Sequence, residues 1–178
     1  MALANSPSAY GSVSKTLHWL IALLIILMLA GGFFMDDIAN KSLKMTVFNL
    51  HKLTGILILV LMVCRLVWRL SNPRPDLAPQ TPRFEKVMAT LGHSLLYVLV
   101  IAMPLSGWIM STAADHAPTL GGLSLALPFI ARSQALSALF YSYHQTIAWV
   151  IIAIIVLHVA AALKHHFIDK DQVLKGML

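Results

Sequence analysis

Two histidines stand fourteen residues apart in a long apolar stretch near the C-terminus, His144 and His158. Fourteen residues make almost four turns of an α-helix, so both rings should lie on one side of it, about 21 Å apart along the axis. Earlier apolar stretches carry His51, expected near the level of His144, and His18, expected near the level of His158. Two stacked pairs of neutral imidazoles on facing helices suit bis-histidine haem, in which iron takes one nitrogen ligand on each face of the porphyrin.

Two further histidines leave alternatives open. His93 is expected about 11 Å along its own helix, close to the level of His158, and on geometry alone it competes with His18 as the fourth ligand. His165 follows His158 by seven residues, so it lies on the same helix face two turns further toward the C-terminus. It could serve a substrate pocket or lie among the lipid headgroups.

The helix that carries His51 offers two supporting residues. Gly55 lies four residues after His51 on the same face and leaves room for a macrocycle against the backbone. Arg65 lies fourteen residues after His51 and should face the same way, near the level of His158. We expect its guanidinium to pair with a haem propionate, which would explain an arginine so far inside an apolar helix.

The composition indicates the kind of element that positions these residues. The chain has 178 residues, of which 58% are hydrophobic and 11% charged, against about 25% charged in an average globular protein. Its mean hydropathy is +0.78. These values argue against a soluble enzyme or a nucleic-acid binder, despite the net charge of +6. The single cysteine, Cys64, excludes a disulfide framework.

Four stretches are long enough to cross the roughly 30 Å of bilayer hydrocarbon. We predict one domain over residues 1–178, an all-α bundle of four transmembrane helices with two b haems in its core. The helices are expected at about 14–35, 47–70, 85–112 and 138–167. A connection with four prolines, residues 71–82, should be non-helical, and residues 116–133 should lie along the membrane interface.

The basic residues predict the orientation, because cytoplasmic loops of membrane proteins carry an excess of lysine and arginine. One side of the predicted bundle has nine of them and the other has four, so both termini should be cytoplasmic. The nine are Lys15, Arg65, Arg69, Arg74, Arg83, Lys86, Lys164, Lys170 and Lys175, and the four are Lys41, Lys44, Lys52 and Arg132.

The sequence resembles the bacterial cytochrome b561 family, which includes membrane superoxide oxidases. The resemblance extends over nearly the whole chain, and the motifs that carry it occur in order. They are Tyr10-Gly-Ser-Val-Ser-Lys-Thr-Leu-His18-Trp19, Asn49-Leu-His51-Lys-Leu-Thr-Gly55, Arg65-Leu-Val-Trp-Arg69, Leu91-Gly-His93, Met103-Pro-Leu-Ser-Gly107, Tyr143-His144, and Leu157-His158-Val-Ala-Ala-Ala-Leu-Lys-His165-His166-Phe167.

This resemblance implies axial pairs of His18 with His158 and of His51 with His144. It also implies a protein of the bacterial inner membrane that takes electrons from periplasmic superoxide and reduces ubiquinone at the cytoplasmic side. The position of His165 is similar to that of a quinone-contacting histidine. His165, or His93 if it binds no iron, could donate a proton to quinone. Lys52, beside His51, could steer the superoxide anion to the outer haem.

Two other functions fit the same sequence. In the first, the haems remain but the protein is a membrane anchor that relays electrons between quinone and a periplasmic redox protein. In the second, it is a histidine-lined proton or metal transporter without haem. A zinc protease is disfavoured because the H-E-x-x-H motif does not occur in the sequence.

Overall fold

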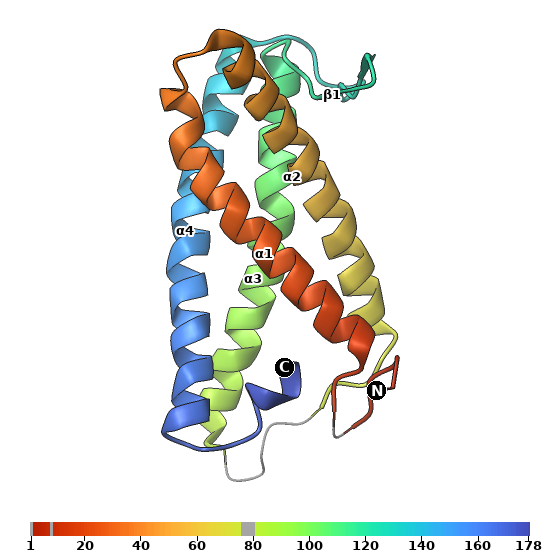
Figure 1. Cartoon of the computed structure of the whole chain (residues 1–178), viewed down its shortest axis with the longest axis vertical. Coiled ribbons are helices and arrows are strands. Elements are labelled where there is room, and N and C mark those ends of the chain that lie inside the picture. The colour runs from red at the N-terminus through yellow and green to blue at the C-terminus, as the bar shows by residue number, and fades with distance from the viewer. Residues whose placement is uncertain (1, 8, 76–80) are drawn as a thin grey trace.

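Four long helices and a short hairpin make up the part of the chain that the computed structural model describes, residues 2–7, 9–75 and 81–178 (Figure 1). Each of the four is long and apolar enough to cross a membrane. The all-α four-helix membrane bundle expected from the sequence is therefore confirmed. The helices are α1 (Ser12–Phe34), α2 (Lys41–Leu70), α3 (Arg83–Ala113) and α4 (Gln134–Phe167).

Side-chain caps determine where two of these helices begin. The side chain of Asn40 accepts a hydrogen bond from the backbone N–H of Leu43 at 3.0 Å, and Ser133 accepts one from Leu136 at 3.2 Å. Each cap satisfies a backbone donor that the first turn of a helix leaves without a partner. Helices α2 and α4 consequently begin before the expected positions, 47 and 138, with polar first turns that hydropathy assigns to loops.

The proline-rich connection follows α2. Residues 71–75 and 81–82 are non-helical, as the prolines suggested, and residues 76–80 lie outside the described part of the chain. Pro104, by contrast, stands inside α3. A Cβ added to Gly55 of α2 would lie 3.7 Å from the Cβ of Pro104 and 3.9 Å from the Cε of Met28, so Gly55 marks a close approach of three helices.

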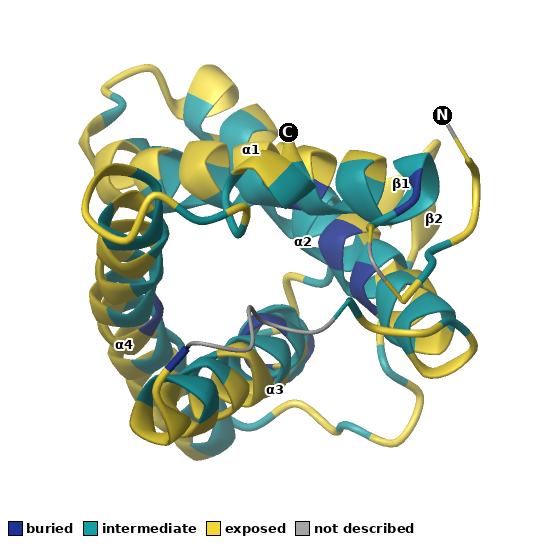
Figure 2. Ribbon diagram, turned by 90° about the horizontal axis from the view of Figure 1, so that it is seen from below, coloured by how far each residue is buried: buried dark blue, intermediate teal, exposed yellow. Residues whose placement is uncertain are grey.

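Helices that follow one another in the chain pack together. The most extensive packing joins α3 to α4, and α2 packs on both α1 and α3. Among the described residues, α4 has no comparable packing with α1 or α2. Seen along the bundle, the four helices form a ring in which α1 and α4 are its first and last members (Figure 2).

An apolar layer closes the middle of this ring. Ile151 of α4 is 2% exposed and lies seven residues from His144 and seven from His158. Buried side chains from the other three helices complete the layer, and they are Ile21, Ile58, Met62 and Val100. The layer therefore separates the level of His144 from the level of His158.

A small hairpin covers the end of the bundle where α2 begins. Its strands β1 (Thr119–Leu120) and β2 (Leu123–Ser124) are antiparallel. Gly121 and Gly122 form the turn with positive φ angles of 57° and 84°, which glycine adopts without steric cost. The carboxamide of Asn49 on α2 donates to the carbonyl of Thr119 and accepts from its N–H, both at 2.8 Å. We refer to this as the hairpin end.

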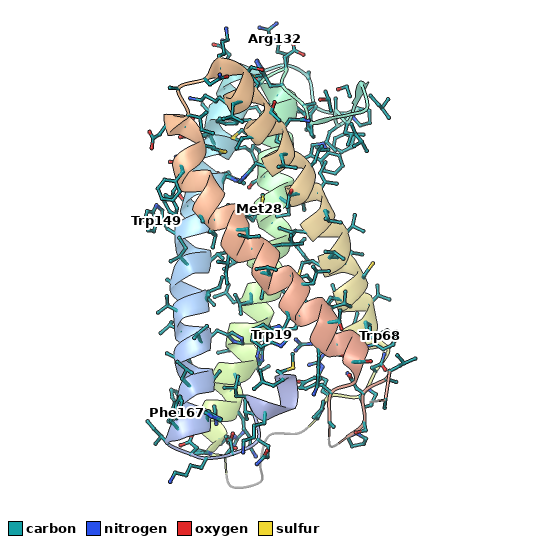
Figure 3. All side chains as sticks on the ribbon, in the orientation of Figure 1. Trp19, Met28, Trp68, Arg132, Trp149 and Phe167 are labelled. Atoms are coloured by element: carbon teal, nitrogen blue, oxygen red, sulfur yellow. The ribbon has the colours of Figure 1, made fainter. Side chains whose placement is uncertain are left out.

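Both termini lie at the opposite end, which we refer to as the terminal end (Figure 1). Two tryptophans lie at this level (Figure 3), and one bonds to the C-terminal segment while the other joins α2 to α1. The indole N–H of Trp19 donates to the carbonyl of Met177 at 2.7 Å, and that of Trp68 donates to the hydroxyl of Ser14 at 3.1 Å. Trp149 and Phe167 are instead exposed on α4, and the ring centre of Trp149 lies 5.3 Å from that of Phe33 on α1.

The carboxamide of Asn49 generates a prediction about the hairpin. Asn49→Ala removes both hydrogen bonds to the backbone of Thr119 and a longer one from its hydroxyl, at 3.4 Å. A well-formed bond of this kind is worth about 1 kcal/mol. We expect the amides of residues 119–124 to exchange hydrogen at least several-fold faster, with little change in the helices, as measured by hydrogen–deuterium exchange. Thr46→Ala is the matched control, because its hydroxyl bonds only within α2, to Ser42. Unchanged exchange in the hairpin of Asn49→Ala would contradict the prediction.

Candidate functional site

Two pairs of histidine rings face each other inside the bundle. At the hairpin end, the ring centres of His51 on α2 and His144 on α4 are 6.4 Å apart, with an interplanar angle of 68°. At the terminal end, those of His18 on α1 and His158 on α4 are 6.3 Å apart, at 65°. All four side chains are half-buried. Both pairs thus join α4 to a helix with which it has little packing.

These separations can be compared with those that a metal requires. A metal–nitrogen bond of about 2 Å on each side, with each nitrogen about 1.2 Å from its ring centre, places two axial imidazoles about 6.4 Å apart, centre to centre. Both observed separations agree with this value. The donor set also fits, because neutral imidazole is a common axial ligand of haem iron. The two histidine pairs could therefore each hold one b-type haem.

Hydrogen bonds determine which nitrogen of His144 is free. Its Nδ1 lies 3.1 Å from the carbonyl oxygen of Met103 and 2.9 Å from the hydroxyl of Ser106. That hydroxyl itself donates to the same carbonyl at 2.7 Å, so Nδ1 must carry the proton and donate. The tautomer leaves Nε2 of His144 as the ligand nitrogen, and a hydrogen bond of this kind orients a metal-binding ring.

Two glycines allow close approach to the hairpin-end rings. A Cβ added to Gly107 on α3 would lie 3.0 Å from Cε1 and 3.2 Å from Nδ1 of His144. A Cβ added to Gly32 on α1 would lie 3.7 Å from Cε1 of His51, an ordinary contact. The ring of His144 can therefore occupy its position only because residue 107 has no side chain.

A third histidine joins the terminal-end pair. The ring centres of His93 on α3 and His158 are 5.5 Å apart at 72°, an edge-to-face contact. This separation is about 0.9 Å shorter than two rings on one iron require, which favours direct packing of His93 on His158. The side chain of His93 is exposed, whereas His18 and His158 are half-buried.

Arg65 lies beside α3. Its Nε donates to the hydroxyl of Tyr97 at 3.1 Å, and its guanidinium lies 5.8 Å from the centre of the Tyr97 ring. The guanidinium of Arg69 lies over the same ring at 4.8 Å. Tyr97 therefore holds two cations near the terminal-end histidines, and the remaining N–H groups of Arg65 are available to a carboxylate.

Lys52 bonds to the backbone of the segment that leads into the hairpin. Its Nζ donates to the carbonyl oxygen of His116 at 2.6 Å. Two of the other three cations expected at this end have acidic partners: Lys44 lies 3.8 Å from Asp36, and Arg132 lies 3.6 Å from Asp115. Gly55, one turn into the bundle from His51, contacts Met28 and Pro104 as described above.

His165 lies in a charged cluster at the terminal end. Its Nδ1 is 2.6 Å from Oδ2 of Asp171, and its Nε2 is 3.9 Å from Oε2 of Glu85 on α3. Lys164 bridges Glu85 and Asp169 with contacts of 2.9 and 2.8 Å. The structure therefore separates His165 from the terminal-end histidine pair and places it among carboxylates.

Sequence reasoning did not assign several of these residues. Met103, Ser106 and Gly107 belong to one motif of the resemblance, but its spacing alone does not reveal that a carbonyl and a hydroxyl orient His144. Asp171 and Glu85 were also missed. A signal existed for Asp171, because an acid six residues after a histidine at a helix end can fold back to it.

The comparison with known proteins decides the family. A family model described as prokaryotic cytochrome b561 matches residues 9–178. The chain belongs to this family. Members of the cytochrome b561 family bind b-type haem, and the chain is accordingly a multi-pass bacterial membrane protein of electron transfer.

Individual relatives agree with the assignment. The chain is 34% identical over 184 residues to cytochrome b561 homolog 2 of Escherichia coli K12, a match that covers 100% of this chain and 95% of that protein. It is 30% identical to cytochrome b561 homolog 1 of the same organism, over 93% of this chain and 96% of the relative. It is 29% identical to a protein of Yersinia pestis described as probable superoxide oxidase CybB, over 95% of each chain.

The contact between Gly107 and His144 can be tested by a matched pair of substitutions in α3. Gly107→Ala places a methyl group against the ring, and such overpacking costs about 1–3 kcal/mol. We expect it to displace His144 and to lower the haem content or shift a midpoint potential in a redox titration. Gly92→Ala is the control, because nothing lies within 4 Å of a Cβ at that position. Equal spectra and potentials for the two variants would contradict the assigned role of Gly107.

Proposed function

We propose that this cytochrome holds two b haems, one between His18 and His158 and one between His51 and His144. The observation that carries the proposal is the separation of 6.3 and 6.4 Å between rings on helices that have little packing with each other. Bound haem supplies reversible one-electron storage, which no side chain of this protein offers. Arg65 pairs with a propionate, whereas Gly55 serves the close approach of α2 to Pro104 and Met28.

We further propose that the terminal end is cytoplasmic and the hairpin end periplasmic. The support is the distribution of lysine and arginine, nine toward the terminal end against four toward the hairpin end. His51 and His144 then serve the periplasmic side, and His18 and His158 the cytoplasmic side. His93 packs against His158 as a neighbour and not as a ligand.

The electron donor that we propose is superoxide and the acceptor is ubiquinone. The name of the Yersinia pestis relative supports the donor, and the position of Lys52 beside His51 places a cation near the periplasmic pair. Two superoxide ions give up one electron each and become two dioxygen molecules. One ubiquinone takes both electrons and two protons and becomes ubiquinol, with His165 at the end where the protons are taken up.

A second function is favoured by one observation. Lys44, Lys52 and Arg132 are each engaged by an acid or a carbonyl oxygen, which weakens a field that would attract a small anion. A relay between quinone and a periplasmic redox protein needs no such field. The transporter hypothesis is disfavoured, because the apolar layer around Ile151 offers no polar path for an ion or a proton between the two histidine levels.

The two electron-transfer functions differ in what the isolated protein can do. We expect the purified cytochrome, given a superoxide source and ubiquinone, to form ubiquinol at a rate well above that of the protein-free mixture, measured from the absorbance of quinone and quinol. Superoxide dismutase should abolish this formation. A rate equal to the protein-free control would refute the oxidase and leave the relay.

A substitution tests the assignment of the haem pairs. His144→Ala removes one ligand of the periplasmic pair and leaves His18 and His158 intact. We expect the haem content to fall from about two to about one per chain in a pyridine haemochrome assay. His116→Ala is the control, because its ring bonds only to the nearby carbonyl of Ala114. Two haems per chain in His144→Ala would refute the pairing.

A further inference from the structure

The C-terminal segment after α4 folds back under the bundle. Helix α4 ends at Phe167, and Lys170 has a φ of 54°, a left-handed conformation that reverses the chain. The segment then crosses toward α1, where the carbonyl of Met177 accepts the indole N–H of Trp19, the neighbour of His18 (Figure 1). It therefore connects the helix of His158 to the helix of His18 at the terminal end.

Asp171, in this segment, is bonded through both carboxylate oxygens. Oδ2 accepts from Nδ1 of His165 at 2.6 Å, and Oδ1 accepts the backbone N–H of Val173 at 2.9 Å. The backbone N–H of Asp171 also donates to the carbonyl of His165 at 3.1 Å. The carboxylate is 9% exposed and the imidazole 12%, so these contacts are largely shielded from water. Such charge-assisted bonds are among the stronger ones in proteins.

Occupation of Nδ1 leaves Nε2 as the ring nitrogen that can exchange a proton. Its nearest charged group is Glu85 of α3, with Oε2 at 3.9 Å. The other charged groups around the ring are Asp169, at 3.2 Å from Nδ1, and Lys164, which bridges Asp169 and Glu85. Glu85 and Asp169 are each 29% exposed, so they reach water while the imidazole is shielded. The cluster thus connects the partly exposed carboxylate of Glu85 to the shielded imidazole of His165.

We propose that Asp171 is a positioning residue that fixes His165 as the proton donor to quinone, with Glu85 as the group that returns protons to His165 from the cytoplasm. The proposal rests on the function proposed above. In each of two steps, the N–H bond at Nε2 of His165 breaks and an O–H bond forms on quinone as an electron arrives. Nε2 is then reprotonated through Glu85, so that two protons and two electrons convert one quinone to one quinol.

Two other interpretations of the cluster explain less. Glu85, His165 and Asp169 each offer an atom close enough to share a metal ion. However, the ammonium of Lys164 already lies 2.9 Å from Glu85 and 2.8 Å from Asp169, where it neutralises the charge that a divalent cation would need. A purely structural ion-pair network would need only Lys164 and its two acids. It would not need Nε2 of His165 to face Glu85.

The test compares three variants of the haem-loaded, full-length protein. His165→Gln retains a hydrogen-bond donor but cannot carry a proton through a ring. Asp171→Asn has one acceptor oxygen in place of two, so either Nδ1 of His165 or the N–H of Val173 loses its carboxylate acceptor. Gln172→Ala is the matched control, since it is the next residue and its exposed side chain has no hydrogen bond in the described structure. Only variants with the wild-type haem content are compared. If one of His165→Gln and Asp171→Asn loses haem, the other alone is enough for the test.

Stopped-flow spectroscopy then measures two rates between pH 6 and pH 9. These are the reduction of the haems by superoxide and their reoxidation by a short-chain ubiquinone. At pH 8 we expect reoxidation to slow by about tenfold or more in His165→Gln and several-fold in Asp171→Asn, because general acid catalysis by a placed group is lost. At pH 6 the difference should narrow, because solvent protons are more abundant. Reduction by superoxide should not change.

The outcomes separate the proton donor from the function on which it rests. Reoxidation in His165→Gln and Asp171→Asn equal to Gln172→Ala at every pH overturns the role of the cluster and leaves the proposed function standing. A loss that is the same at every pH, with a raised KM for quinone alone, also overturns it, because it indicates a quinone contact without proton transfer. If wild-type protein is not reoxidised by quinone at all, both proposals fail together.

Discussion

The constraint on which the structure depends is that α4 must present two imidazoles to partners on α1 and α2, helices with which it packs far less than with α3. Fourteen residues between His144 and His158 bring both rings to one side of the helix. The helix packs most extensively on α3, and α2 in turn joins α3 to α1. Each histidine pair is therefore held open by helix packing elsewhere in the ring. Such an arrangement is stable when something that binds both rings fills the separation, as iron in a porphyrin would under the proposed function.

The apolar layer between the two pairs has a consequence for chemistry. Electrons tunnel through packed hydrocarbon, whereas ions and protons need polar groups or water to cross it. Ile21, Ile58, Met62, Val100 and Ile151 form such a layer at the middle of the bundle. A protein built this way can pass electrons between its ends while each end keeps its own proton exchange.

The four helices and the two histidine levels could be predicted from the sequence because both follow from the spacing of residues along it. Uncharged stretches predicted four spans, and the positions of His18, His51, His144 and His158 predicted the two levels. The tertiary contacts could not be predicted in the same way. The sequence left His93 in competition with His18, and only the ring separations, 5.5 against 6.3 Å, distinguish a packed neighbour from a partner across a metal. The bond from Lys52 to the carbonyl of His116 depends on where an irregular segment folds, which residue types do not encode.

The two ends of the bundle differ in the groups that touch their histidines. At the hairpin end, the groups that orient His144 are the carbonyl of Met103 and the hydroxyl of Ser106, neither of which exchanges a proton near neutral pH. At the terminal end, His165 lies against Asp171 and faces Glu85. A donor that loses only an electron needs surroundings that exchange no proton, like those of His144. An acceptor that gains electrons and protons needs ionisable groups, like those around His165. The direction of electron flow proposed for this cytochrome thus agrees with an asymmetry in hydrogen bonding that the residue spacing alone does not reveal.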